Sequence, residues 1–339
     1  MKIPSNDLAC RTLFLQASDE GRGPVLFGDS GERACRAVLP FVEGVSFPEI
    51  YLEFPLAGDP FLDVTVLYGN LKPGTRFASP AAEGTEAVLD WFAGVSADIG
   101  DITFGYELDS GKTSPGPAAV HFQPRRHTDL VLPFCRALGR EDAARLYADL
   151  SARMPEDWPL AFFGLFRGRK DAPLRVCGYL SREEMQRCAE APARLEEVFR
   201  AVGFTAWDDP MISRIAAVLA AAPATVDFQF DILPDRSLGS TFALDIGFRT
   251  EQSEAIRSSF LDGPFANVMN LFEAWGVADS RWKLVSGIAL TRSVPVEDGE
   301  GLPRLFALMI QPRWIKIRWT GGILMKSKMY CLASAGLTD

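Results

Sequence analysis

Residues 225–235, TVDFQFDILPD, alternate apolar and polar side chains at every second position. Side chains at positions i and i+2 of a β-strand point to the same face, so this stretch predicts a strand with one apolar and one polar face. A second alternating run, STFALDIGF at residues 240–248, follows a turn at Asp235–Gly239. The two runs predict a β-hairpin.

This arrangement recurs along the chain. Five hairpins are predicted, at residues 49–57 with 61–69, 101–109 with 118–125, 161–168 with 174–181, 225–235 with 240–248, and 305–319 with 323–333. Helical patterns separate them, at residues 83–95, 128–139, 141–154, 181–203, 210–222 and 254–276. Hairpins place neighbouring strands antiparallel, and each return to the sheet places the next hairpin alongside.

The predicted fold class is therefore α+β, a closed ten-stranded antiparallel β-barrel with the helices outside. We expect one domain over residues 1–339, with an N-terminal segment containing a helix at 1–45 and the repeated hairpin-and-helix units at 46–335. The amphipathic helices need an apolar sheet face to cover, so the polar faces of the strands should point inward. A barrel of this strand number can enclose a polar, solvent-filled chamber.

The predicted inward residues include many charged groups. The cationic set and its neighbouring tyrosines comprise Arg167, Arg175, Lys316, Arg318, Lys326, Lys328, Tyr179 and Tyr330. The acidic and polar set comprises Glu53, Asp63, His121, Gln123, Asp227 and Gln229. This distribution predicts a lumen with a cationic part and an acidic part. Clustered lysines and arginines need either an anion, such as a diphosphate, or carboxylate partners in an ion network.

The composition limits the classes of partner. The formal net charge of −9 and the pI near 5.0 argue against nucleic-acid and anionic-membrane partners. No apolar run reaches the length of a membrane-spanning helix and no secretory signal pattern opens the chain, so we expect a cytoplasmic protein. Six scattered cysteines and two histidines predict buried reduced thiols and no metal site.

Two short patterns on the last hairpin carry a resemblance to a known family. Lys316-Ile-Arg318 and Lys328-Met-Tyr330, with Arg175 and Tyr179 similar in kind, resemble the strand-borne patterns of the ABBA, or PT-barrel, aromatic prenyltransferases. The resemblance covers residues 46–335 in architecture and implies repeated α-β-β-α units. The chain length is similar to that of bacterial members, including the cyanobactin-type peptide prenyltransferases.

The resemblance implies a prenyl transfer from dimethylallyl or geranyl diphosphate to an aromatic small molecule or peptide side chain. The Lys and Arg set would bind the diphosphate, and Tyr179 and Tyr330 would shield the allylic cation. Glu53 or Asp63 would orient the acceptor and take its proton. The other polar residues, His121, Gln123, Asp227 and Gln229, would face the acceptor or the lumen.

The resemblance implies no covalently bound cofactor. Asp208-Asp209 continues into Pro210, so there is no DDxxD motif and no metal ligand set is predicted, although Mg²⁺ can accompany the diphosphate donor. Two other functions stay open: a triphosphate-tunnel hydrolase, whose ExExK pattern is missing at Glu49–Glu53, and a non-catalytic barrel that binds an anionic or isoprenoid ligand. The oligomeric state stays open too.

Overall fold

A computed structural model provides the structure. It describes residues 23–28, 33, 49–68, 86–95, 101–108, 119–124, 127–167, 173–247, 263–288, 290–297 and 302–338. Most of the predicted N-terminal segment, residues 1–45, lies outside these ranges, and α2 (Gly23–Phe27) is the helix described in it.

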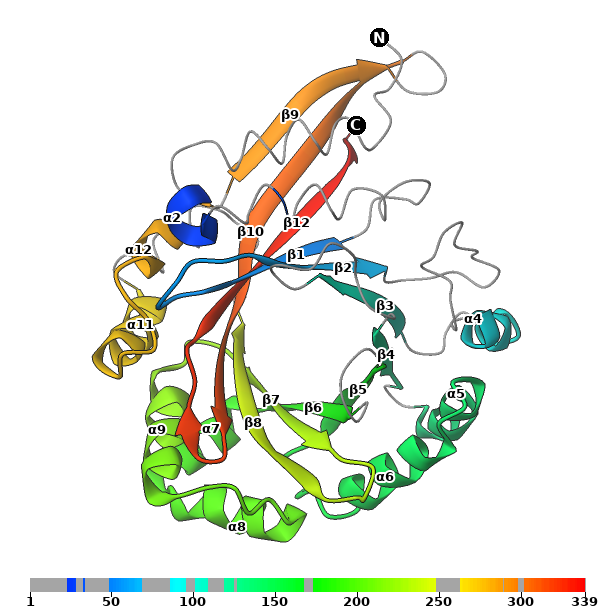
Figure 1. The fold of residues 1–339 in the computed structure, drawn as a ribbon, viewed down its shortest axis with the longest axis vertical. Coiled ribbons are helices and arrows are strands. Elements are labelled where there is room, and N and C mark those ends of the chain that lie inside the picture. Colours follow the sequence, from blue (N-terminus) through cyan, green and yellow to red (C-terminus); the bar gives the residue numbers. More distant parts are fainter. Residues whose placement is uncertain are drawn as a thin grey trace.

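Ten antiparallel strands form a closed ring, as predicted (Figure 1). Hydrogen bonds join them in the order β10-β12-β1-β2-β3-β4-β5-β6-β7-β8, and β8 pairs back with β10. The strands are β1 (Glu49–Pro55), β2 (Asp63–Tyr68), β3 (Asp101–Leu108), β4 (Ala119–Gln123), β5 (Leu160–Phe166), β6 (Leu174–Leu180), β7 (Val226–Ile232), β8 (Leu238–Gly247), β10 (Pro303–Thr320) and β12 (Lys328–Thr338). The last hairpin therefore closes the barrel by pairing with both the first hairpin and the fourth.

Helices surround the ring on its outer side (Figure 1). They are α4 (Glu86–Ala93), η4 (Thr128–Leu130), α5 (Val131–Ala137), α6 (Glu141–Ser151), α7 (Arg182–Glu190), α8 (Ala193–Val202), α9 (Asp209–Ala221), α11 (Pro264–Ala274) and α12 (Trp282–Val285). None of those seen in the described ranges is long and apolar enough to cross a membrane. The apolar face of β7 is buried beneath this layer, since Val226, Phe228 and Phe230 are at most 1% exposed. The predicted inside and outside faces are confirmed for this strand.

The single helix predicted at residues 181–203 is wrong. The structure has two helices there, α7 and α8, separated at Ala191 and Pro192. Proline disfavours helical backbone in the residue before it, and it has no N–H to continue the hydrogen-bond ladder. The predicted start is correct, because the Ser181 hydroxyl accepts a hydrogen bond from the Glu184 backbone N–H.

A strand that was not predicted, β9 (Leu290–Glu297), pairs with the first half of β10. Together with the C-terminal half of β12, these strands extend beyond the ring (Figure 1). The register of β10 against β12 shifts between Pro312 and Trp314. The bulge separates the projecting half of β10 from the half that lines the barrel. The last short strand, β11 (Ile323–Leu324), pairs with the end of β10.

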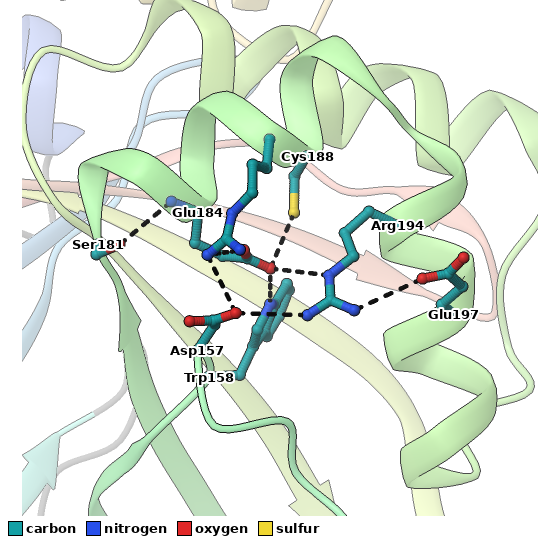
Figure 2. Close-up of polar contacts among 8 residues, drawn as sticks. Asp157, Trp158, Ser181, Glu184, Cys188, Arg194 and Glu197 are labelled. Atoms are coloured by element: carbon teal, nitrogen blue, oxygen red, sulfur yellow. Dashed lines mark hydrogen bonds and ion pairs between the residues drawn. The ribbon is translucent and has the colours of Figure 1, made fainter.

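Outside the barrel, a buried carboxylate joins α7 and α8 to the chain before β5 (Figure 2). Glu184 is 0% exposed and accepts hydrogen bonds from Trp158 Nε1 at 2.7 Å and from Arg194 Nε at 3.2 Å. Both of those donors lie at Glu184 Oε1, and Cys188 Sγ lies 3.6 Å from the same oxygen. Arg187 Nη2 lies 2.9 Å from the other oxygen, Oε2. A buried charge is tolerated only with such partners, so this cluster fixes both helices against the barrel.

Replacing this carboxylate should destabilise the protein strongly. We expect Glu184→Ala to lower the free energy of unfolding by about 3–5 kcal/mol, because Trp158 and two arginines would lose a buried partner. Glu190→Ala is the matched control on the same helix, where the exposed side chain accepts a hydrogen bond from Gln186. Its effect should stay within about 0.5 kcal/mol. Urea unfolding measures both values, and equal effects would contradict the structural role of Glu184.

Candidate functional site

The barrel encloses a cavity of about 730 Å³, lined by residues from all ten of its strands. This volume lies within the range of small-molecule sites. Twelve of the fourteen residues predicted for the lumen line it: Glu53, Asp63, His121, Gln123, Arg175, Asp227, Gln229, Lys316, Arg318, Lys326, Lys328 and Tyr330. Strand alternation therefore places these side chains correctly, apart from Lys326, which lies between β11 and β12, and their roles stay predictions.

Arg167 and Tyr179 do not line the cavity. Arg167 follows the last residue of β5, and Tyr179 is 48% exposed near the end of β6. Alternation along a strand places a side chain in the lumen only while the strand runs beside the lumen. Both residues lie near or just beyond the ends of their strands and outside the cavity wall, and their predicted roles in diphosphate binding and cation shielding stay predictions.

Lys328, on β12, is held by two carboxylates from the first hairpin. Its Nζ lies 2.5 Å from Glu53 Oε1 and 3.3 Å from Asp63 Oδ2. Burial alone would raise the pKa of Glu53, but the charge and hydrogen bond of Lys328 hold that pKa below its ordinary value. The Glu53 carboxylate is consequently ionised at neutral pH. It also accepts a hydrogen bond from Tyr330, whose own pKa is raised well above its ordinary value by burial and then by the charge of Glu53.

Two other lumen cations are also paired. Lys316 Nζ lies 3.4 Å from Asp245 Oδ2 and donates a hydrogen bond to Gln229 Oε1 at 3.2 Å. Arg175 binds Asp231 with both arms of its guanidinium, at 2.8 and 3.1 Å. The prediction that cations and carboxylates occupy separate parts of the lumen is therefore wrong. Neighbouring strands place opposite charges side by side, which lowers the cost of burying them.

Arg318 and Lys326 differ from these three cations. They line the same cavity, yet neither makes an ion pair with any residue in the described ranges. Both side chains are exposed, so they lie where the cavity meets solvent. Gly58, which has a φ of +76°, makes room for Lys326, since a Cβ there would lie 2.0 Å from Lys326 Nζ. These two cations are available to an anion that enters the barrel.

An aromatic stack stands beside the cations. Trp314 packs against Tyr330 with 5.1 Å between ring centroids and against Tyr51 with 4.8 Å. Lys316 Nζ lies 5.1 Å from the centroid of the Tyr330 ring. Sequence reasoning missed Trp314, although the signal was available, because residues 314, 316 and 318 share one strand face. The stack offers aromatic faces to a cation or to a flat ligand.

Asp227 is the exception among the inner carboxylates. It lies directly opposite Asp245 in the β7–β8 ladder, and it has no hydrogen bond or ion pair with the described part of the chain. Burial, and then the charge of Asp245, raises the pKa of Asp227 to about 7, while Lys316 opposes the shift. Burial also raises the pKa of Asp245. Asp227 therefore changes its charge near neutral pH.

The raised pKa of Asp227 should cost stability in neutral and basic solution. A carboxyl group whose pKa is raised on folding holds its proton in the native state after the unfolded chain has lost it, so stability falls as pH rises from about 4 to about 7. We expect Asp227→Asn to raise the free energy of unfolding at pH 8 by an amount on the order of 1 kcal/mol and to change it little at pH 4. Urea unfolding at the two pH values tests this, and an equal effect at both would contradict it.

The described residues contain no group of three or more His, Cys, Asp or Glu side chains that could hold a metal ion. The four cysteines in the described ranges, Cys135, Cys177, Cys188 and Cys331, are buried and free of disulfides. Burial raises the pKa of the Cys135 thiol to about 12 and that of Cys188 to about 12, which keeps both protonated.

Comparison with solved structures gives a shared fold. The chain matches 5-dimethylallyltryptophan synthase from Streptomyces coelicolor with a TM-score of 0.53 and 15% identity, over 97% of this chain and 95% of that chain. It matches the prenyltransferase PriB, in its apo form, with a TM-score of 0.51 and 15% identity over the same shares. No protein-family model and no curated protein sequence matches the chain. The chain therefore shares the fold of these two proteins, an antiparallel barrel with helices outside, as the sequence resemblance implied.

Proposed function

We propose that the protein is a prenyltransferase that moves an allylic isoprenoid from its diphosphate to an aromatic acceptor inside the barrel. The observation that carries the proposal is the pair of lumen cations without ion-pair partners in the described ranges, Arg318 and Lys326, on the same hairpin as the stack of Trp314 and Tyr330. A donor of this class has an anionic head and an apolar tail that becomes cationic. Arg318 and Lys326 suit the anionic head, and the stack of Trp314 and Tyr330 suits the tail. The shared fold adds support, since one protein of similar structure is named 5-dimethylallyltryptophan synthase.

In the proposed reaction, Arg318 and Lys326 bind the diphosphate. Lys316 lies two positions from Arg318 on β10, and Lys328, the first residue of β12, lies two positions from Lys326. Arginine can donate two hydrogen bonds to one phosphate, whereas lysine acts as a point charge. The C–O bond to the donor breaks, and the diphosphate leaves with the bonding electrons. Cations placed at the leaving group stabilise the charge that develops there. Mg²⁺ can be coordinated by the diphosphate oxygens of the donor without a set of protein ligands.

The allylic cation would lie against the aromatic stack. Tyr330, which the sequence singled out, and Trp314, which it did not, present ring faces that stabilise a cation and exclude water. The acceptor ring attacks the allylic carbon, a C–C bond forms, and the ring then loses a proton. Glu53 is ionised and can accept a hydrogen bond from an N–H or O–H of the acceptor. Glu53 or Asp63 receives the proton, because the protonated ring is far more acidic than a carboxylic acid.

The cavity size bears on the acceptor. A volume of about 730 Å³ can hold a five-carbon donor together with one small aromatic ring system. A peptide acceptor would place a single aromatic side chain inside the barrel. We therefore propose dimethylallyl diphosphate and a small aromatic acceptor as the first pair to test, with geranyl diphosphate and aromatic peptides as the alternatives.

The proposal predicts prenyl transfer that depends on Arg318 and Lys326. The purified protein, given dimethylallyl diphosphate and a panel of aromatic acceptors, should produce adducts that carry one added prenyl group, detected by mass spectrometry. Arg318→Gln should weaken donor binding by about 10- to 100-fold, because a charge-assisted hydrogen bond contributes about 1.5–3 kcal/mol. Arg136→Gln removes the same charge from an exposed position on α5 and should change nothing.

The other outcomes are distinct. Donor binding that depends on Arg318 but leads to no transfer with any acceptor would assign the barrel to a non-catalytic isoprenoid-binding protein. Donor binding that is absent, or equal in Arg318→Gln and the wild type, would contradict the proposal itself.

A further inference from the structure

A row of ionisable side chains crosses five neighbouring strands. The register places Tyr179, Asp227, Asp245, Lys316 and Lys328 opposite one another in turn, on β6, β7, β8, β10 and β12. Directly opposite residues of an antiparallel pair have Cβ atoms about 4.5–5.5 Å apart. The row therefore contains two adjacent carboxyl groups followed by two adjacent ammonium groups, and like charges in such positions destabilise a sheet.

Three of these four charges have partners that reduce the repulsion. Lys328 lies beside Glu53 and Asp63, and Lys316 lies 3.4 Å from Asp245 Oδ2. Asp245 is 8% exposed, and its other oxygen, Oδ1, is buried without a hydrogen-bond partner. Asp227 has no hydrogen bond or ion pair within the described residues. Both carboxyl groups line the cavity, so the uncompensated negative charge faces the interior of the barrel.

A bound cation would satisfy both groups at once. A primary ammonium carries three N–H donors, and Asp227 with Asp245 Oδ1 offers three acceptor oxygens that lack partners in the described ranges. The described residues contain no set of three metal-ligating side chains, which favours an organic cation over a metal ion. The aromatic stack is close to this pair along the chain: Trp314 lies two positions from Lys316 on β10, and Tyr330 lies two positions from Lys328 on β12.

We propose that Asp227 and Asp245 form a subsite for the protonated amine of an amine-bearing aromatic ligand. The inference rests on the proposed function for the statement that this ligand is the prenyl acceptor, but the subsite itself can be tested by binding alone. This role explains why a destabilising carboxyl group, without a partner in the described ranges, lies in the lumen. Stability lost at a binding site is common in natural proteins.

The subsite makes binding depend on pH. The titratable groups that face Asp227 are Asp245 from β8, Lys316 from β10, and Tyr179 and Cys177 from β6. A proton on Asp227 removes the negative charge that the ammonium needs, so affinity for an amine should rise as pH increases from 6 to 8. A ligand with a hydroxyl in place of the amine should show no such rise.

Equilibrium binding to the full-length protein, without any donor, tests the subsite. Isothermal titration calorimetry at pH 8 would compare tryptamine, tyramine and phenethylamine, each with the alcohol in which a hydroxyl replaces the amine. At least one amine should bind ten times more tightly than its alcohol. Asp227→Asn should remove that tenfold preference. Asp149→Asn removes the same charge from an exposed side chain on α6 and should keep the preference.

Several results would overturn the inference. These are the absence of binding by all three amines, equal binding of each amine and its alcohol, or a preference that survives Asp227→Asn in a variant shown to be folded by its unfolding midpoint. Binding of Mg²⁺ or Mn²⁺ that is lost in Asp227→Asn would assign the pair to a metal ion instead. Amine binding that depends on Asp227 without any prenyl transfer would keep the subsite and reject the proposed function. Prenyl transfer in a protein whose amine binding does not depend on Asp227 would keep the proposed function and reject the subsite.

Discussion

The closure of the antiparallel ladder between β8, β10, β12 and β1 determines the rest of the structure. An open sheet could leave its polar face in bulk water and its side chains free to spread. Once β10 pairs with both β8 and β12, every polar face of the ten strands must share one enclosed space. The helices cover the apolar outer face of the sheet. The polar inner face encloses the cavity of about 730 Å³.

Enclosure makes charge compensation necessary. Lys316, Lys328 and Arg175 each lie beside a carboxylate from a neighbouring strand, which limits the cost of burying them. The residues without such compensation in the described ranges are then the informative ones. Arg318 and Lys326 leave positive charge at the solvent side, and Asp227 leaves negative charge inside. Ligands that bring an anion to Arg318 and Lys326 and a cation to Asp227 would compensate these charges.

The sequence predicts the barrel because the alternating hairpin pattern recurs five times with helical patterns between the hairpins. Twelve of the fourteen proposed lumen residues line the cavity. Periodicity does not report where a strand leaves the lumen, so Tyr179 and Arg167 were misplaced. It does not report the register between the first and last strands, so the pairing of Lys328 with Glu53, 275 positions away, could not be predicted. The break between α7 and α8 could have been predicted from Pro192. Strand β9 carries Pro295, an edge-strand feature that weakens the strand signal.

A crystal structure of the protein with dimethylallyl thiolodiphosphate, a donor analogue, would test the central claim most directly. We expect the diphosphate to contact Arg318 and Lys326 at the solvent side of the cavity, with the prenyl tail directed toward the rings of Tyr330 and Trp314. A tail placed against other lumen residues, a diphosphate bound outside the barrel, or an empty lumen at saturating analogue would contradict the account.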